Sequence, residues 1–220
     1  MTSSPEISVV IPLYNEVENI DDLCAQLKSG LAPLGRSYEV LLVDDGSRDG
    51  TGARALALAK SDPTLRVIRL RRNFGQTAAF SAGFDHARGR IVVTSDGDLQ
   101  NDPADIGAVV AALEEGDGCD IVCGWRKNRH DPLSKKIPSF FANRLISWAT
   151  GVQIHDYGCS LKALRADVVK GIRLYGEMHR FIPAVAAQMG VRVREVVVNH
   201  RPRTRGVSKY GIGRTTRAGP

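Results

Sequence analysis

The chain has 220 residues, of which 43% are hydrophobic and 25% are charged. These proportions are ordinary for a globular protein and exclude a mainly disordered chain, and the length suits one sizeable domain. No run of apolar residues is long enough to cross a bilayer, and no apolar run follows a basic N-terminal segment, so neither a membrane-spanning helix nor a secretory signal is expected.

The net charge of +6 is unevenly distributed. Residues 1–120 hold 11 Lys and Arg against 19 Asp and Glu, a net charge of −8, whereas residues 121–220 hold 19 against 5, a net charge of +14. A basic second half is typical of proteins with an anionic partner such as phosphate, nucleic acid or a membrane surface. A basic surface that meets only solvent is the alternative, and composition does not decide between them.

The four cysteines lack the spacing of a metal site. They are Cys24, Cys119, Cys123 and Cys159. Their apolar or mixed surroundings predict buried free thiols, which suit a reducing cytosol, rather than a disulfide or a zinc site.

In the first half of the chain, short β-branched runs alternate with helical patterns. Strands are predicted at Ile7–Pro12, Glu39–Val43, Arg66–Leu70, Ile91–Thr94 and Asp120–Cys123. Helices are predicted at Asn19–Leu31, Thr51–Ala59, Gln76–Ala87 and Pro103–Glu115. Nearly continuous apolar strands that alternate with helices indicate a parallel sheet with helices on both faces. In such sheets the ligand crevice lies at the carboxyl ends of the strands, so functional residues are expected directly after each strand.

After residue 124 the pattern changes. A polar, basic loop at Arg126–Lys136 precedes a helical stretch at Ser139–Thr150. The segment Tyr157–Leu164, to which no element type is assigned, is followed by predicted helices near Ala166–Ile172 and Met178–Met189 and by a strand at Val191–Asn199. The tail from His200 onward is rich in Arg and Gly and is expected to be flexible beyond about Tyr210.

An acidic turn, Ser-Asp-Gly-Asp-Leu-Gln, follows the strand Ile91–Thr94 directly. Residues i and i+2 of an extended chain point to the same face, so Asp96 and Asp98 can converge on one cation. Mg²⁺ or Mn²⁺ held by one or two carboxylates plus substrate phosphates is the usual arrangement in nucleotide chemistry, and Gly97 would let a diphosphate approach the backbone. An acidic turn without a ligand is the alternative interpretation.

Polar loops also follow the first three strands. The first strand leads into Pro12–Glu16, the second into the paired carboxylates Asp44 and Asp45, and the third into Arg72–Gly75. Paired carboxylates at the end of a strand can accept hydrogen bonds from a base and from ribose hydroxyls. A turn with a helix cap is the alternative, and it is compatible with binding.

Together these loops resemble a known enzyme family. The runs Pro-x-Tyr-Asn-Glu from Pro12, Val-Asp-Asp-Gly-Ser-x-Asp-Gly-Thr from Val43, Asn-Phe-Gly-Gln from Asn73 and Asp-Gly-Asp-Leu-Gln from Asp96 resemble family 2 glycosyltransferases with the GT-A fold. Later segments narrow the resemblance to dolichyl- and undecaprenyl-phosphate sugar synthases: Gly124–Arg126, Asp156–Ser160, Gly176–Pro183 and Gly206–Tyr210. The match runs from Ile7 to Arg214.

The resemblance implies an α/β fold of the GT-A type, with a Rossmann-like, mostly parallel sheet, helices on both faces and a C-terminal acceptor-side extension. It implies one domain over residues 1–210, with a nucleotide-sugar-binding half at 1–124 and an acceptor-side half at 125–210, and a flexible tail at 211–220. The implied reaction is the inverting transfer of a hexose from a GDP-mannose or UDP-glucose type of donor to a polyprenyl phosphate, with Mg²⁺ or Mn²⁺ as cofactor.

The resemblance also assigns residues to roles. Those that would hold the donor nucleoside are Pro12, Tyr14, Glu16, Asp44 and Asp45. Those that would hold the metal and the diphosphate are Asp96, Asp98 and Gln100. Those that would close over the donor phosphates are Arg203, Ser208 and Lys209, and those that would take the acceptor phosphate are Arg126, Lys135 and Ser139.

The acceptor decides which further groups are needed. A phosphate acceptor is already an anion at neutral pH and needs no general base, so positioning and charge stabilisation supply most of the catalysis. A hydroxyl acceptor, such as a growing polysaccharide, needs a base, for which Asp156 is the candidate; a turn or cap carboxylate is the alternative. His179 and Arg180 either reach a phosphate or serve the fold.

Two further hypotheses concern partners. A non-catalytic module that binds a nucleotide sugar or nucleic acid is disfavoured because binding to a polyanion does not select an acidic crevice, so no nucleic-acid partner is expected. The aromatic and basic residues around Ser139–Thr150 are typical of a helix lying on an anionic membrane, with packing against the sheet as the alternative.

The resemblance implies a place at the inner face of the cytoplasmic membrane, with or without a separate membrane subunit. Many relatives continue into transmembrane helices, so the end at Pro220 puts stable anchoring by this chain in doubt.

Overall fold

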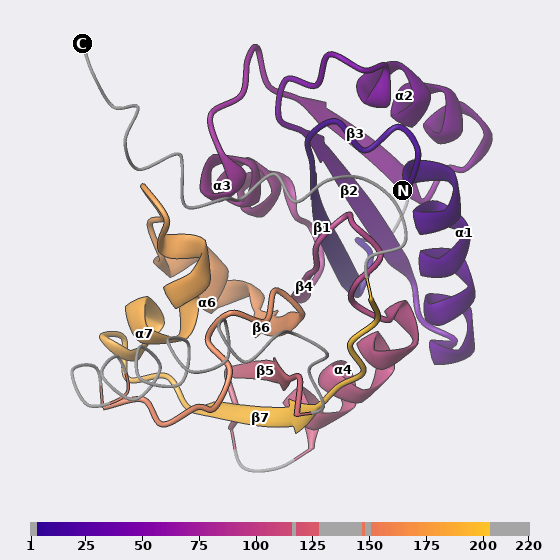
Figure 1. Cartoon of the computed structure of the whole chain (residues 1–220). Helices are drawn as coiled ribbons and strands as arrows, with labels where there is room; N and C mark the ends of the chain where they lie inside the picture. The colour runs from indigo at the N-terminus through magenta and orange to yellow at the C-terminus, as the bar shows by residue number, and fades with distance from the viewer. Residues whose placement is uncertain (1–3, 116–117, 128–146, 148–150, 203–220) are drawn as a thin grey trace, which may run out of the picture.

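The computed structural model describes residues 4–115, 118–127, 147 and 151–202. Within these ranges seven strands form one sheet (Figure 1). The strands are β1 Ile7–Leu13, β2 Tyr38–Asp44, β3 Leu65–Arg69, β4 Ile91–Thr94, β5 Ile121–Trp125, β6 Lys162–Arg165 and β7 Val193–Val197. The α-helices are α1 Ile20–Leu31, α2 Thr51–Ser61, α3 Gln76–His86, α4 Ile106–Glu114, α6 Ala166–Gly171 and α7 Ile182–Ala187, and 3₁₀ turns cover Ala32–Leu34, Pro103–Asp105 and Met178–Phe181.

The strands are arranged in the order β3-β2-β1-β4-β6-β5-β7. β1 pairs in parallel with β2 and β4, β2 with β3, and β5 with β7. β6 runs antiparallel to both of its neighbours, β4 and β5. The prediction of a mostly parallel sheet is therefore confirmed, and the reversed strand lies in Tyr157–Leu164, the segment for which no element type was predicted.

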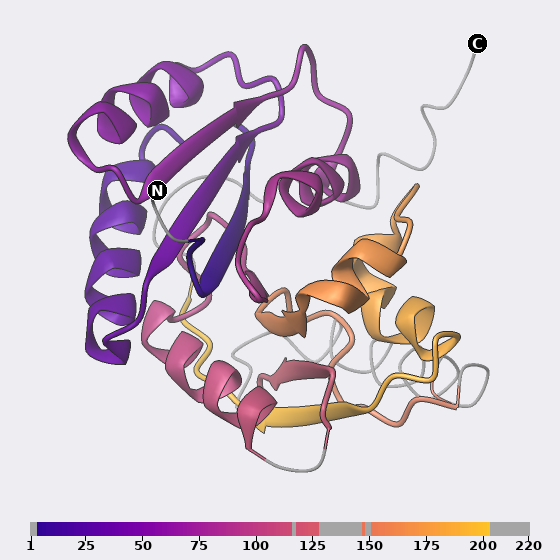
Figure 2. The ribbon, with the colours of Figure 1, turned by 180° about the vertical axis from the view of Figure 1, so that it is seen from behind.

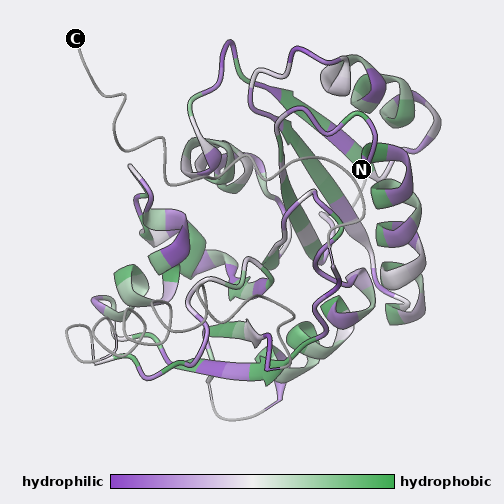
Figure 3. Cartoon of the chain, viewed as in Figure 1, coloured by the Kyte–Doolittle hydropathy of each residue, from purple (hydrophilic) through white to green (hydrophobic). Residues whose placement is uncertain are grey.

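Helices cover both faces of the sheet because alternate strand residues point to opposite sides. Val9 and Ile11 of β1 pack in a core with α1, α2 and α4, whereas Val10 packs in a second core with α3, α6 and α7. Figures 1 and 2 show α1 and α2 on one side of β1–β3 and α3 on the other. The central strands are hydrophobic along their length, whereas the helices carry mixed faces (Figure 3).

Two helices begin differently from the prediction. Both the Pro103 and the Met178 segments open with a 3₁₀ turn before the α-helix starts. In α7 this places Pro183 in the first helical turn, where a missing N–H costs no hydrogen bond. The predicted helix at Ser139–Thr150 lies outside the described residues, apart from Ser147.

All four cysteines are free thiols, and Cys119, Cys123 and Cys159 are buried, as predicted, while Cys24 is half-buried. Burial raises the pKa of Cys123 to about 12 and that of Cys159 to about 11, so these thiols stay protonated and unreactive. Among the described helices, none combines the length and apolar character that crossing a bilayer requires.

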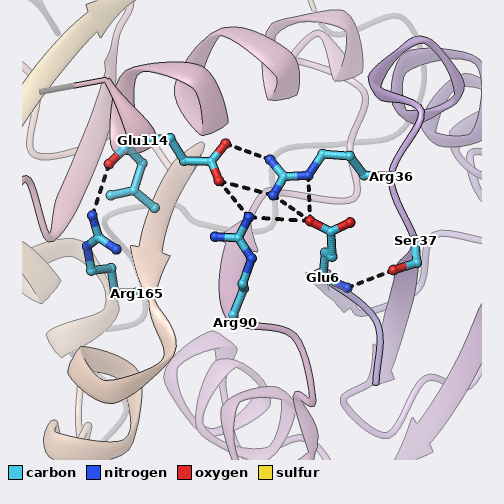
Figure 4. A network of polar contacts seen from close by, with 7 residues as sticks. Glu6, Arg36, Ser37, Arg90, Glu114 and Arg165 are labelled. Carbon is cyan, nitrogen blue, oxygen red and sulfur yellow. Dashed lines mark hydrogen bonds and ion pairs between the residues drawn. The ribbon is translucent and has the colours of Figure 1, made fainter. Parts of the chain in front are cut away.

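A charge network closes the edge of the sheet where β1 and β4 begin. Arg36 donates to Glu6 (2.9 Å) and to Glu114 (2.6 Å). Arg90 bridges the same two carboxylates at 3.3 and 2.8 Å (Figure 4). The network joins the start of β1, the segments before β2 and β4, and the end of α4. It lies at the edge opposite the loops that follow the strands.

Candidate active site

A cleft of about 340 Å³ opens at the carboxyl ends of β1, β2 and β4. Eight of the residues predicted for the site line it: Pro12, Tyr14, Glu16, Asp45, Asp96, Asp98, Gln100 and Arg126. Asp44 and Asp156 are buried just outside the lining. The remaining predicted residues lie outside the described ranges; they are Lys135, Ser139, Arg203, Ser208 and Lys209.

The loops after β1 and β2 are fastened together by side-chain hydrogen bonds. Thr51 Oγ1 accepts from the Glu16 N–H (2.8 Å), and Asp49 accepts from the Val17 N–H (3.1 Å). Burial alone would raise the pKa of Asp49, but hydrogen bonds from the Thr51 hydroxyl and backbone outweigh it and lower the pKa. The Asn15 backbone, at a φ of 55°, adopts the left-handed conformation that Asn tolerates. The wall that carries Tyr14 and Glu16 is therefore held in place before any ligand arrives.

The adjacent carboxylates Asp44 and Asp45 have different environments. Asp44 is 1% exposed, and it accepts from the Ser47 N–H (2.9 Å) and from Arg69 Nε (3.3 Å). Asp45 lines the cleft and accepts from the backbone N–H groups of Phe74 (2.7 Å) and Gly75 (2.9 Å). Asp45 thus fixes the loop that leads into α3, while Asp44 fixes the turn after β2.

The acidic turn after β4 has a tightly fitted backbone. A Cβ atom on Gly97 would lie 2.6 Å from Leu13 Cδ2 and 3.1 Å from the Pro12 carbonyl oxygen. Gly97 is therefore required by its packing against the end of β1, in addition to any approach of a ligand. Leu99 has a φ of 63°, a left-handed conformation that costs a non-glycine residue about 1 kcal/mol or more.

Asp96 and Asp98 both line the cleft, as a site for Mg²⁺ or Mn²⁺ requires. Among the described residues, no group of three or more His, Cys, Asp or Glu side chains forms a closed metal site. Two carboxylates, with Gln100 beside them, suit an ion that keeps positions for substrate phosphates and water. The donor set therefore fits such an ion.

Gln76 is a site residue that the sequence reasoning missed. Its Nε2 donates to Asp96 Oδ1 at 2.6 Å from the first residue of α3. The hydrogen bond joins the start of α3 to the acidic turn 20 residues later in the chain, so it orients one carboxylate of the acidic pair. The quoted Asn-Phe-Gly-Gln run contained this residue, but only the fold shows which group it meets.

Arg126 and Asp156 form a bidentate ion pair at the side of the cleft. Arg126 Nε and Nη2 donate to the carboxylate at 2.7 and 2.9 Å, and the side chains are 12% and 4% exposed. Burial alone would lower the pKa of Arg126, but the hydrogen bonds and charge of Asp156 raise it, so the guanidinium stays charged. Both oxygens of Asp156 accept from Arg126, so its position is that of a residue that orients Arg126.

The floor and far wall of the cleft come from β6 and from the segment before α7. They include Ser160, Lys162, His179 and Arg180. His179 shares a 2.6 Å hydrogen bond with Thr77. Burial, with smaller contributions from the charges of Arg180 and Lys162, lowers the pKa of His179 to about 4, so the ring is neutral near pH 7.

The segment beyond β7 returns to the acidic turn. The Arg201 N–H donates to the Gln100 carbonyl (2.9 Å), and its guanidinium pairs with Asp102 (2.6 Å). His200 forms an isolated bridge with Asn101. The described chain therefore ends, at Pro202, beside the loop that carries Asp96 and Asp98.

The sequence model described as "Glycosyl transferase family 2" matches residues 8–173. The chain is 49% identical over 218 residues to a dodecaprenyl-phosphate galacturonate synthase of Rhizobium johnstonii, covering 97% of this chain and 64% of that protein. It is 40% identical over 208 residues to an undecaprenyl-phosphate 4-deoxy-4-formamido-L-arabinose transferase of Shewanella sediminis, covering 94% and 62%. The chain thus spans less than two thirds of each of these relatives.

Solved structures share the fold at low sequence identity. A mannosyltransferase of Pyrobaculum calidifontis in complex with GDP-Man and Mn²⁺ matches with a TM-score of 0.67 and 21% identity, over 92% of this chain and 59% of that one. A glucosyl-3-phosphoglycerate synthase of Mycobacterium tuberculosis, in complex with Mn²⁺, UDP and phosphoglyceric acid, matches with a TM-score of 0.68 and 20% identity, over 90% and 72%. These matches confirm the predicted GT-A fold.

Proposed function

This chain belongs to glycosyltransferase family 2, and from that premise we propose that it transfers a sugar from a nucleotide-sugar donor to a polyprenyl phosphate with inversion at the anomeric carbon. The observation that carries the proposal is the cleft itself, which combines the acidic pair Asp96 and Asp98 with the buried cation Arg126. An acidic pair beside a fixed cation suits a reaction between two phosphorylated substrates. The 49% and 40% identical relatives, a dodecaprenyl-phosphate synthase and an undecaprenyl-phosphate transferase, support the same acceptor.

The donor half of the proposal assigns the nucleoside to the wall of Pro12, Tyr14, Glu16 and Asp45, all of which line the cleft. Asp44, being buried and bonded to its own turn, would act by shaping that wall. Asp96, Asp98 and Gln100 would hold Mg²⁺ or Mn²⁺. Such an ion supplies charge neutralisation of the departing nucleoside diphosphate. The Arg201–Gln100 contact supports a role at the donor phosphates for Arg203, Ser208 and Lys209, which follow closely in the sequence.

The acceptor half assigns the lipid phosphate to Arg126, with Lys135 and Ser139. A phosphate oxygen would attack the anomeric carbon as its bond to the diphosphate breaks, and no proton has to be removed. Asp156 would act by holding the Arg126 guanidinium toward the phosphate. We retain the division into a nucleotide-sugar-binding half at 1–124 and an acceptor-side half at 125–210 as part of this proposal. A cytoplasmic place beside the membrane, with or without a separate membrane subunit, also belongs to it, and the free thiols agree with a reducing compartment.

The test is transfer of labelled sugar into an organic-extractable product. The donors are GDP-mannose, UDP-glucose, UDP-N-acetylglucosamine, UDP-galactose and UDP-galacturonate, with undecaprenyl phosphate, detergent and Mg²⁺ or Mn²⁺. We expect labelled sugar in the lipid phase with the wild-type protein, and no label when a chelator is added or when Asp98→Asn replaces the wild type. Metal-dependent donor hydrolysis without lipid label, together with transfer to a hydroxyl acceptor, would overturn the proposed acceptor; no donor turnover under any condition would overturn the enzyme itself.

A further inference from the structure

The floor of the cleft contains a buried lysine whose charge has no carboxylate partner among the described residues. Lys162 is 2% exposed and lines the cleft. We propose that the Lys162 ammonium is an oxyanion-binding group, which holds a phosphate oxygen or a sugar carboxylate of the substrates. This inference rests on the proposed function for the identity of its ligand.

The position of Lys162 follows from the reversed strand. It is the first residue of β6 and pairs across the sheet with Thr94 of β4 and with Cys123 of β5. Paired residues point to the same face, so the lysine stem lies over the core that contains Cys123 and α3. Thr94 lies two residues before Asp96, which brings the ammonium to the edge of the sheet where the acidic turn begins. The Thr94 hydroxyl donates to the Ser160 carbonyl (2.6 Å) and so ties the start of β6 to β4.

The ammonium donates one hydrogen bond, to the Cys159 carbonyl oxygen. An ammonium has three N–H donors, so the Cys159 carbonyl uses one of them. Among the described residues, Arg126, the other buried cation of the cleft, forms an ion pair with Asp156, whereas Lys162 forms none. Burying a cation without a counter-charge is unfavourable, so a lysine at this place destabilises the unliganded fold unless an anion joins it.

Arg126, His179 and Arg180, which line the cleft with Lys162, do not supply that anion. Arg126 is already compensated by Asp156. His179 is neutral, because burial and the nearby cations hold its pKa at about 4. Arg180 is exposed and lines the same wall of the cleft. Lys162 and Arg180 therefore add positive charge to a cleft that also carries Asp96 and Asp98.

Two chemical sources could bring an oxyanion to this place. One is phosphate, either of the donor diphosphate or of the lipid. The other is a carboxylate on the transferred sugar, which would make Lys162 a specificity residue for uronic acids. The shared chemistry is a singly bonded oxygen anion that meets a point-charge donor at the floor of the cleft.

The experiment measures binding rather than turnover. Dissociation constants are determined by calorimetry for wild type, Lys162→Met and Lys162→Arg, with inorganic phosphate, UDP, GDP, UDP-galactose and UDP-galacturonate in the presence of Mn²⁺, and with undecaprenyl phosphate in detergent. Lys162→Met is expected to weaken one class of probe by about tenfold to a hundredfold, and Lys162→Arg to restore much of the loss. Lys170→Met removes an exposed lysine of α6 and is expected to change none of the constants.

The pattern of losses distinguishes the sources. Weaker binding of UDP-galacturonate but not of UDP-galactose identifies a sugar carboxylate as the ligand. Equally weaker binding of both donors and of UDP identifies the donor diphosphate. Weaker binding of only inorganic and lipid phosphate identifies the acceptor phosphate. Without any ligand, Lys162→Met should unfold at the same temperature as wild type or at a higher one. If the lysine served only the fold, the substitution would lower that temperature. Unchanged constants for every probe, or no binding of any probe by wild type, would overturn the inference. Normal binding without turnover would overturn the transferase proposal and leave this one standing.

Discussion

The residues around the cleft differ in how well their positions could be predicted from the sequence. Asp96 and Asp98 could be identified from the sequence because a strand followed by Asp-Gly-Asp is a local pattern. Asp44 and Asp45 are adjacent and chemically identical, yet one fixes a turn and the other lines the cleft. Successive residues leaving a strand point in different directions, and the sequence does not state which of the two faces the ligand. Gln76 was missed because its partner is supplied by another strand.

Gln76→Leu should weaken the binding of Mn²⁺ without unfolding the protein. The variant removes the 2.6 Å hydrogen bond that orients Asp96. Removing such an orienting partner typically costs about tenfold to a hundredfold in metal affinity or activity. Mn²⁺ titrations of donor binding and of transfer would show the change. Gln188→Leu alters an exposed glutamine after α7 and serves as the control; equal Mn²⁺ dependence in both variants would contradict the role of Gln76.

His179 should make the protein sensitive to mild acid. Its pKa in the fold is about 4 against an ordinary 6.5, so between these values the unfolded chain binds a proton that the folded chain does not. The contribution of neutral His179 to the free energy of unfolding is therefore fully present above about pH 6.5. It decreases as the pH falls toward 4, by up to about 3 kcal/mol. Urea unfolding at pH 7.0 and 4.5 measures the loss.

The variant His179→Gln should reduce the difference between the two pH values, because glutamine does not titrate. His86→Gln changes an exposed histidine at the end of α3 and should keep the wild-type difference. A pH dependence that is the same in His179→Gln as in wild type would show that another group is responsible.

At the level of elements, the strand–helix alternation up to β5 was predictable because the strands are short runs rich in β-branched and apolar residues, each followed by polar turn residues. The reversal of β6 was not predictable in this way. Its four residues begin with a buried lysine, and its direction depends on pairing with β4 and β5, which lie far away in the sequence. The 3₁₀ openings at Pro103 and Met178 are likewise details of packing that periodicity does not record.

The fit between β1 and the acidic turn should be visible in a Gly97→Ala variant. The added methyl group meets Leu13 at 2.6 Å, closer than real side chains approach, so β1 or the turn must shift. Overpacking of this kind typically destabilises a protein by about 1–3 kcal/mol. Chemical denaturation measures the change, and a loss of metal-dependent donor binding should accompany it.

Combining Gly97→Ala with Leu13→Ala tests the cause. If the collision is responsible, the double variant should lose less stability than the sum of the two single variants. Additive losses would place the effect elsewhere, for example in the loss of backbone freedom at residue 97.

For the whole molecule, the network of Glu6, Arg36, Arg90 and Glu114 should contribute to the loss of stability in acid. The hydrogen bond from Arg36 lowers the pKa of both carboxyl groups below the ordinary 4.5. Groups with a lowered pKa stabilise the fold above about pH 4.5 and lose that effect as the pH falls below it. Thermal unfolding between pH 6 and 3 should therefore show a decline in melting temperature below pH 4.5, to which this network contributes.

Arg36→Met should lower the melting temperature at pH 7 by no more than about 3 °C, because the network is partly exposed. It should also flatten the decline below pH 4.5, and 1 M salt should narrow its difference from wild type. Arg173→Met changes an exposed arginine and is expected to match wild type. A decline that stays as steep in Arg36→Met would assign the acid sensitivity to other carboxylates.

The reversed β6 also affects how this chain can vary. Because β5 and β6 are antiparallel neighbours, the connection between Trp125 and Lys162 starts and finishes at the same end of these two strands. A parallel strand would instead require a crossover connection of at least about a dozen residues to the opposite end of the sheet, usually with a helix. Both described ends of the 126–161 connection are fixed to the sheet: Arg126 is paired with Asp156, and Tyr157, Cys159 and Leu161 are buried in the core. Under the proposed acceptor role of this half of the chain, an exchange of acceptor specificity with a relative should keep these buried residues and replace only positions 128–150.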